Sequence, residues 1–299
     1  MNKYRSFVLP IALLLSLFFH EKIVILKSTV PILIFSILFL SFSNIDLKKL
    51  KFSSFNIWLL AFQFTVSLAA YFIFVPFNDI LAQGALLAIL CPVASAVVVI
   101  SCLLGANKEK IGYFSIIGNL SVAVMAPIYF SFIGNQVDMP FRESFILIFS
   151  KMLPIIILPI ALSFLFQYFA PKINRFFVKC NSLSFYLWAI ALTITLSQTT
   201  YFLHYSEKSQ LPIIIALSCI SLFSCILQYG VGYFIGKKYG DTVAGSQGLG
   251  QKNNSLGIWM AYTYLDPLTA IVPASYSIFQ NIYNSYRIAL KEQKDKKNK

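Results

Sequence analysis

Charged residues are scarce in this sequence. Only 12% of its 299 residues are charged and 58% are apolar, whereas a soluble domain carries about 25% charged residues. A chain of this length cannot bury so much apolar surface in a core and still present a polar exterior. The deficit excludes an ordinary soluble protein and predicts an all-α polytopic membrane protein, with lipid around its apolar surface.

Residues suited to metal binding and catalysis are also few. The chain has two histidines and five cysteines, and it contains no Cys-x-x-Cys pair. An odd, scattered set of cysteines argues against a disulfide framework or a zinc site. The Gly-x-x-x-x-Gly-Lys-Ser/Thr motif of nucleotide-binding proteins is missing, which argues against direct use of ATP. We therefore expect no catalytic residues and no resident cofactor, with a membrane-embedded enzyme kept as an alternative.

Long apolar segments make up most of the chain. A membrane-spanning helix needs about 20 mostly apolar residues. Ten segments approach this length, so the sequence predicts ten transmembrane helices. They cover residues 5–20, 22–43, 55–76, 79–104, 111–134, 142–170, 176–203, 210–236, 240–264 and 267–290.

The basic residues follow the order of these segments. If the N-terminus lies inside, the inner loops and the C-terminal tail hold most of the 24 lysines and arginines. Cytoplasmic loops of membrane proteins collect Lys and Arg, so both termini are expected in the cytoplasm of a cell membrane. The net charge of +13 then reflects topology and attraction to anionic membrane lipid. It does not indicate a nucleic-acid partner, and no protein partner is evident.

Ten spans divide into two sets of five, and an odd number per set gives the two sets opposite topology. The expected units are a first inverted repeat at 1–138, a second at 139–290, and a basic cytoplasmic tail at 291–299. Inverted-repeat transporters place their substrate between discontinuous helices at matching positions of the two repeats. Here these positions are the fourth and ninth spans.

The fourth span contains a proline near its middle. Pro92 removes one backbone donor and clashes with the preceding turn, and small residues follow it at once. A break in the helix and a simple proline kink would both fit this segment.

The ninth span is the most unusual part of the chain. Four glycines fall between Gly245 and Gly257, and five consecutive polar side chains run from Gln251 to Ser255. Such a segment cannot be a lipid-exposed helix, because each unsatisfied polar group costs several kcal/mol in hydrocarbon. It either lines a cavity or forms a loop in water. We favour a cavity in which the broken fourth and ninth spans cross, because the matching position of the first repeat is also interrupted.

At these residues the sequence resembles the bile acid:sodium symporter family. Cys91-Pro92-Val-Ala-Ser95-Ala96-Val-Val resembles the family's C-P-G-G-T-A-S-N-V-V, and Gly250-Gln251-Lys252-Asn253-Asn254-Ser255-Leu256 resembles G-M-Q-N-S-G-L and its G-Q-R-N variants. Val272-Pro273 and Gln280-Asn281-Ile282 resemble a V-P…H-N-I pattern in the last helix. The resemblance implies a core of spans 3–5 and 8–10 that rocks against a panel of spans 1, 2, 6 and 7. It also implies a secondary active transporter that moves a small organic anion by alternating access, often coupled to sodium.

Two departures concern the sodium site. The family's Ser-Asn is Ser95-Ala96 here, and its acidic residue falls near Gln247-Gly248. Side-chain oxygens that could still hold a sodium ion belong to Ser95, Ser115, Asn119 and Gln247. The full set of expected substrate- and ion-binding residues is Ser95, Ser115, Asn119, Gln247, Gln251, Lys252, Asn253, Asn254, Ser255 and Asn281.

Lys252 is the third departure, at a position where the family has Gln or Arg. A lysine within a membrane is expensive and by default indicates a functional site. One hypothesis is that its ammonium replaces the coupling cation and attracts an anionic substrate, in a proton-coupled or uncoupled carrier. The alternative is a lysine that snorkels or pairs structurally. A channel is a further functional class, but two matching breaks suit alternating access better.

Overall fold

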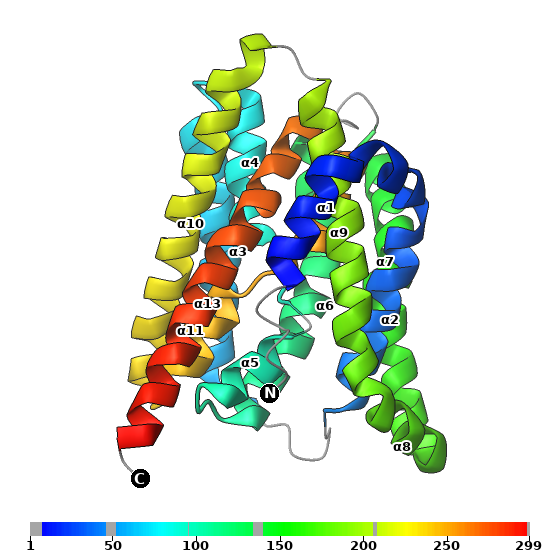
Figure 1. Cartoon of the computed structure of the whole chain (residues 1–299), viewed down its shortest axis with the longest axis vertical. Helices are drawn as coiled ribbons and strands as arrows, with labels where there is room; N and C mark the ends of the chain where they lie inside the picture. Colours follow the sequence, from blue (N-terminus) through cyan, green and yellow to red (C-terminus); the bar gives the residue numbers. More distant parts are fainter. Residues whose placement is uncertain (1–7, 46–51, 95, 134–139, 206–207, 298–299) are drawn as a thin grey trace.

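The computed structural model describes residues 8–45, 52–94, 96–133, 140–205 and 208–297, and the regular elements in these ranges are all helices (Figure 1). In chain order the α-helices are α1 (Val8–Ile23), α2 (Val30–Ser43), α3 (Ser54–Phe74), α4 (Asp79–Leu90), α5 (Val97–Leu103), α6 (Lys108–Ile133), α7 (Phe141–Phe169), α8 (Pro171–Lys179), α9 (Leu183–His204), α10 (Leu211–Lys238), α11 (Thr242–Gly250), α12 (Asn254–Tyr264) and α13 (Ile271–Lys297). Short 3₁₀ helices lie at η2 (Val24–Thr29), η4 (Cys180–Ser182), η5 (Lys208–Gln210) and η6 (Pro267–Ala270).

Several of these helices have the length and composition of membrane spans. Within the described residues, five segments qualify, namely Pro10–Ser43, α3, α6, α7 and α10, and the bent pair α8–α9 adds a sixth if it is counted as one span. The segment Pro10–Ser43 contains η2, where the chain turns so that α1 and α2 run in opposite directions (Figure 1). The all-helical fold is therefore confirmed for these residues and is compatible with a polytopic membrane protein. The number of ten spans and the inverted repeat stay predictions.

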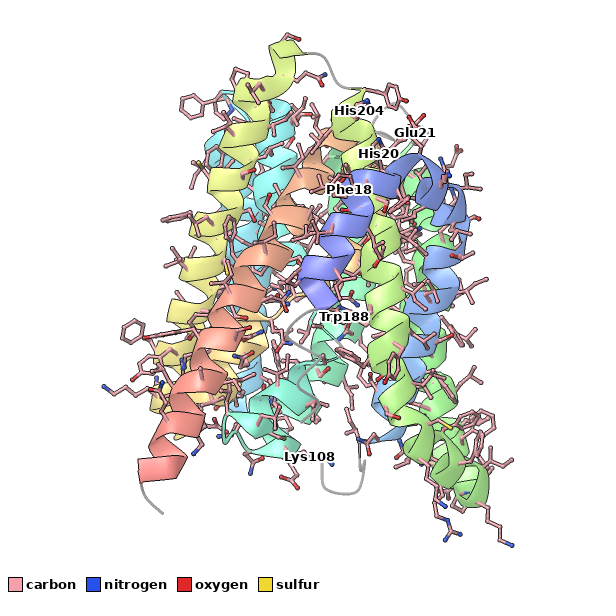
Figure 2. The ribbon with its side chains drawn as sticks, in the orientation of Figure 1. Phe18, His20, Glu21, Lys108, Trp188 and His204 are labelled. Atoms are coloured by element: carbon pink, nitrogen blue, oxygen red, sulfur yellow. The ribbon has the colours of Figure 1, made fainter. Side chains whose placement is uncertain are left out.

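The outer surface carries many large apolar side chains. Phe18 is 75% exposed and Phe77 is 81% exposed, and they have counterparts on most of the long helices (Figure 2). Apolar exposure on this scale marks a surface that another apolar phase covers. It fits helices that face lipid and suggests a membrane-embedded protein.

The helices pack in neighbourhoods that mix distant parts of the chain. α10 packs against α11, α13, α4 and α3, while α9 packs against α1 and α2, and α2 also packs against α7. α6 and α7 pack against each other, and α6 also contacts α11 (Figure 1). This packing does not test the division of the helices into two repeats or into a core and a panel, and both stay predictions. The last helix continues through much of the basic tail, as far as Lys297.

Close backbone contact fixes α11 against α10. A Cβ atom at Gly245 would collide with the backbone of Gly232 and Gly236, so these glycines let the two helices approach closely. Gly240 turns the chain between them with φ of 74°, and Asp241 then caps α11 by accepting a hydrogen bond from the Ala244 amide at 2.8 Å. The sequence thus forms a tight helical hairpin that holds α11 in place.

Basic residues gather at one end of the molecule. The C-terminal ends of α8, α10 and α13 and the start of α6 lie at the lower end in Figure 1, where Figure 2 labels Lys108.

His20, Glu21 and His204 lie at the opposite end of the molecule (Figure 2). There Tyr205 donates a hydrogen bond to the Glu21 carboxylate at 2.7 Å, and this bond raises the pKa of the Tyr205 phenol.

Candidate functional site

The first interruption separates α4 from α5. α4 ends at Leu90, and Cys91 leaves the helical conformation with φ of −44° and ψ of 135°, because the following proline disfavours the α region for the residue before it. The next helix, α5, begins at Val97. The interruption after α4 is therefore a true break, and the alternative of a simple proline kink is wrong.

The second interruption separates α11 from α12. α11 ends at Gly250, and Gln251 is extended with φ of −93° and ψ of 102°. Asn253 then caps α12, its Oδ1 accepting a hydrogen bond from the Leu256 amide at 3.2 Å. Gln251 and Lys252 are each 2% exposed, so the alternative that this segment forms a loop in water is wrong.

The two breaks lie side by side and hydrogen-bond to each other. The Ala94 amide donates to the Gln251 carbonyl at 3.0 Å, and the Asn253 amide donates to the Pro92 carbonyl at 2.8 Å. Val93 and Lys252 thereby form an antiparallel bridge. Each interrupted segment supplies backbone partners that the other has lost, which is how irregular backbone is tolerated away from water.

Side chains cap the carboxyl end of α4 by hydrogen-bonding to its last carbonyls. The last carbonyls of a helix have no partner within it, and here three side chains donate to them. The Gln228 amide donates to the Ala88 carbonyl at 3.0 Å, and the Lys252 ammonium donates to Ile89 at 2.8 Å. The Gln63 amide donates to the carbonyls of Leu90 and Cys91 at 3.0 and 3.2 Å.

The carboxyl end of α11 is closed from α13. The Tyr276 hydroxyl donates to the Gly250 carbonyl at 2.8 Å and accepts from the Gln228 amide at 3.2 Å. One turn further along α13, Gln280 Oε1 accepts from the Lys252 backbone amide at 2.7 Å. Gln228 therefore connects the ends of both half-helices, and α13 holds the second break in position.

Sequence reasoning did not single out Gln63, Gln228 or Tyr276. Gln63 and Gln228 are buried polar residues in helices that are otherwise largely apolar, whereas Tyr276 is a buried residue of the more polar α13. Polar groups in membrane helices seldom stay unpaired, so isolated glutamines in apolar segments were the available signal. Their partners lie far away in the sequence, which hid the pairing.

The predicted polar residues around the breaks are placed as follows. On α6, Asn119 Nδ2 donates to the carbonyls of Val93 and Ser115 at 3.3 and 2.7 Å. On α11, Gln247 Nε2 donates to Asn284 Oδ1 at 2.9 Å. Asn119 thus borders the first break, whereas Gln247 is held from α13. Ser95 lies outside the described residues.

Asn281 makes its hydrogen bond within its own helix, where Nδ2 donates to the Ser277 carbonyl at 2.7 Å. It is half-buried. This bond does not tie it to either break, unlike its neighbour Gln280.

Several buried polar atoms around the second break have no partner. They are the Oε1 atom of Gln251, the Oδ1 atom of Asn254 and the Oγ atom of Ser255. Asn254 and Ser255 open α12, and the amino end of a helix favours negative charge. The Ser255 hydroxyl can donate to an anion at this positive helix end, whereas the two carboxamide oxygens can only accept hydrogen bonds.

The sodium hypothesis has mixed support from the geometry. Asn119 Oδ1 and Gln247 Oε1 are buried oxygens without a partner, as a sodium site would need. They are fixed by different neighbours, and the Lys252 amino group already lies at the end of α4. Across the described residues, no group of three His, Cys, Asp or Glu side chains could hold a metal ion.

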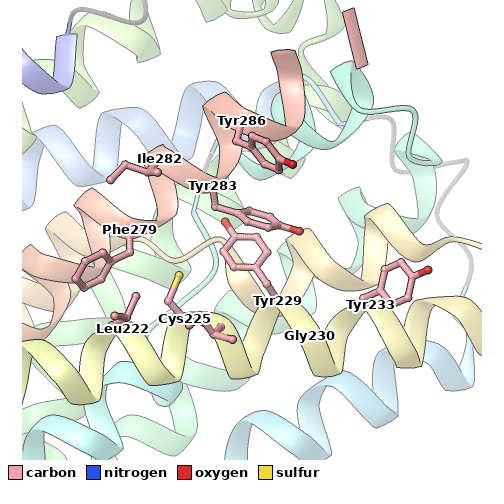
Figure 3. A pocket seen from close by; sticks show the side chains of 10 residues that line it. Leu222, Cys225, Tyr229, Gly230, Tyr233, Phe279, Ile282, Tyr283 and Tyr286 are labelled. Atoms are coloured by element: carbon pink, nitrogen blue, oxygen red, sulfur yellow. The ribbon is translucent and has the colours of Figure 1, made fainter. Parts of the chain in front are cut away.

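A separate cavity of about 520 Å³ lies between α10 and α13 (Figure 3). Its lining is mainly apolar and aromatic, and Ile226 and Ile282 at its rim are 64% and 62% exposed. The Tyr229 and Tyr283 rings lie with their centroids 4.0 Å apart inside it. None of the residues predicted for the site lines this cavity, so it is distinct from the crossing of the breaks.

Comparison of the sequence with protein-family models and with curated proteins returned no match. The functional interpretation therefore depends on the geometry of the chain itself.

Proposed function

We propose that the protein is a secondary active transporter that moves a small organic anion across the membrane by alternating access. The paired breaks of α4–α5 and α11–α12 carry this proposal. Two discontinuous helices that cross and satisfy each other's backbone are the typical frame of a substrate site in inverted-repeat carriers. The resemblance of both break sequences to the bile acid:sodium symporter family supports the same conclusion.

The polar groups at the amino end of α12 form the proposed anion site. Gln251, Asn254 and Ser255 hold buried polar atoms without partners, and leaving such groups unpaired costs about 1–3 kcal/mol each. A bound carboxylate or sulfonate would accept a hydrogen bond from the Ser255 hydroxyl, at the positive amino end of α12. The Oε1 atom of Gln251 and the Oδ1 atom of Asn254 are acceptors, so they would pair only with donor groups of the substrate.

The membrane orientation is part of the proposal. The basic ends of α8, α10 and α13 gather at one end of the molecule (Figure 1), and Lys and Arg concentrate on the cytoplasmic side of membrane proteins. We therefore place this end on the cytoplasmic side of a cell membrane, and the charge pattern of the sequence favours both termini on that side. Ten spans in two inverted repeats would account for the alternation of charge along the chain.

Anion binding is tested by thermal unfolding of the purified protein with labelled taurocholate and with pyruvate, as probes of sterol acids and keto acids. A ligand that binds the folded state raises the melting temperature, and we expect at least one probe to do so. Ser255→Ala should need about a tenfold higher probe concentration for the same rise in melting temperature, because it removes one hydrogen bond to a charged group.

Ser36→Ala is the matched control, because the Ser36 hydroxyl donates to Ile32 within α2 at 2.9 Å. It should leave the shift unchanged. A protein that responds to neither probe, or a Ser255→Ala variant that responds like the native protein, would count against an anion site at α12.

A further inference from the structure

We propose that the Lys252 ammonium is a built-in cation that fills the cation position at the carboxyl end of α4, so that the carrier works without sodium. Its consequence for transport rests on the proposed carrier function, whereas the occupancy of the position by Lys252 does not. The inference concerns how the site is driven and which ions it can take.

The carboxyl end of α4 has the physics of a cation site. A helix end carries a partial negative charge of about half an electron, and its last carbonyls lack partners within the helix. In discontinuous transporter helices, such freed carbonyls and half-helix ends coordinate the coupling cation. Here the end of α4 is buried, with Ile89 at 2% and Leu90 at 0% exposure.

Lys252 occupies this position with good geometry. Its Nζ atom donates to the Ile89 carbonyl at 2.8 Å, and the side chain is 2% exposed. The partner is a carbonyl and not a carboxylate, so backbone dipoles stabilise the charge as they would for a bound metal ion. A snorkelling lysine would instead carry its ammonium to the membrane surface.

The neighbouring carbonyls are closed by neutral donors. The Gln228 amide donates to the Ala88 carbonyl, and the Gln63 amide donates to the carbonyls of Leu90 and Cys91. Both glutamines keep a buried Oε1 atom without a partner. The end of α4 is therefore shared among two amides and one ammonium.

The second anchor of Lys252 holds it at the crossing. Its backbone amide donates to Gln280 Oε1 at 2.7 Å, and the same residue forms the bridge with Val93. The cation thus sits on the break of α11–α12 and binds the end of α4, joining the two interrupted segments. A sodium ion would join them only while bound, whereas the tethered ammonium joins them permanently.

A cation that cannot leave changes the energetics of transport. No sodium gradient can be used through this position, and each cycle returns the lysine to its starting point. The net charge moved per cycle is then that of the anion alone. Uptake should be the same in sodium and in choline salts, and an interior-positive membrane potential should increase it.

Thermal unfolding in sodium chloride and in choline chloride tests the occupancy without any substrate. The native protein should melt at the same temperature in both salts. Lys252→Ser removes the ammonium and opens its space, so this variant should melt lower in choline chloride and recover by several degrees in sodium chloride. The recovery reflects a free ion that takes the vacated position.

Lys110→Ser is the matched control. Lys110 also donates to a backbone carbonyl at the end of a helix, from Nζ to Tyr239 at 2.8 Å, but it lies in the first turn of α6, away from the two breaks. Its replacement should create no sodium response.

Three results would overturn the inference. The first is a native protein that is stabilised by sodium, and the second is a Lys252→Ser variant that melts identically in the two salts. The third is a variant that fails to fold in both, since sodium is expected to restore it. If the salt pattern holds while no probe anion is transported, the built-in cation stands and the carrier proposal fails. Transport that requires sodium would support the carrier proposal and would overturn the built-in cation.

Discussion

At the scale of single residues, the central feature is the number of buried polar side chains that serve as helix caps. Gln63, Gln228 and Lys252 come from three separate segments and converge on the last turn of α4. In a buried position, where water cannot replace a lost partner, each cap prevents a penalty of about 1–3 kcal/mol. These residues hold the break open in one shape.

Gln63→Leu should therefore destabilise the protein. It preserves the volume of the side chain approximately but leaves the Leu90 and Cys91 carbonyls without a donor, at a cost of about 1–3 kcal/mol. Chemical denaturation in detergent, followed by tryptophan fluorescence, measures the loss. Gln167→Leu is the matched control, because Gln167 also caps a carbonyl, that of Phe42 at 3.0 Å, but outside the crossing. Equal losses in anion binding for the two variants would contradict a special role for Gln63.

The sequence allowed part of this site to be predicted. Pro92 and the polar run from Gln251 to Ser255 have local signatures, since one removes a backbone donor and the other cannot face lipid. Gln63, Gln228 and Tyr276 have no such signature, because their partners are carbonyls that lie far away along the chain. Asn281 matched a motif, yet its amide hydrogen-bonds within α13.

At the scale of elements, the positions of the breaks depend on how α11 is held. α11 and α10 meet through glycines, and the hairpin between them turns at Gly240. The contact places Gly250, the last residue of α11, next to the Tyr229 ring, where a Cβ atom would collide with the aromatic carbons. Small residues at a helix interface allow this close approach in membrane proteins.

Gly245→Val should disrupt this hairpin. The added side chain meets the backbone of Gly232, which cannot move aside as a flexible side chain would, and overpacking of this kind costs about 3 kcal/mol. We expect a lower melting temperature and loss of anion binding. Gly230→Ala is the control, since a Cβ atom there meets nothing within 4 Å. A Gly245→Val variant as stable as Gly230→Ala would refute the packing argument.

Element boundaries were harder to predict than the elements themselves. The expected spans 5–20 and 22–43 correspond to α1 and α2, but a 3₁₀ segment, η2, separates them. The expected span 176–203 is divided into α8 and α9, because the basic, amphipathic sequence of α8 differs from the apolar sequence of α9. Hydropathy identifies apolar length and carries little information on where a helix turns.

At the scale of the whole molecule, an apolar outer surface surrounds two paired breaks. The outer surface is apolar enough for lipid, and several buried polar residues lie around the two breaks. The Lys252 amino group lies at the end of α4, and unpaired polar groups lie at the start of α12. A positive charge and hydrogen-bond donors around this crossing would favour the binding of an anion that the protein moves across the membrane.

Counterflow in proteoliposomes tests the central claim most directly. Vesicles that contain the protein are loaded with an unlabelled anion that stabilises it, and uptake of the same labelled anion is followed from outside. The account predicts saturable uptake that the internal anion accelerates, with equal rates in sodium and choline salts. Uptake that rises linearly with concentration and ignores the internal anion would indicate a channel, and absence of any flux would contradict a carrier.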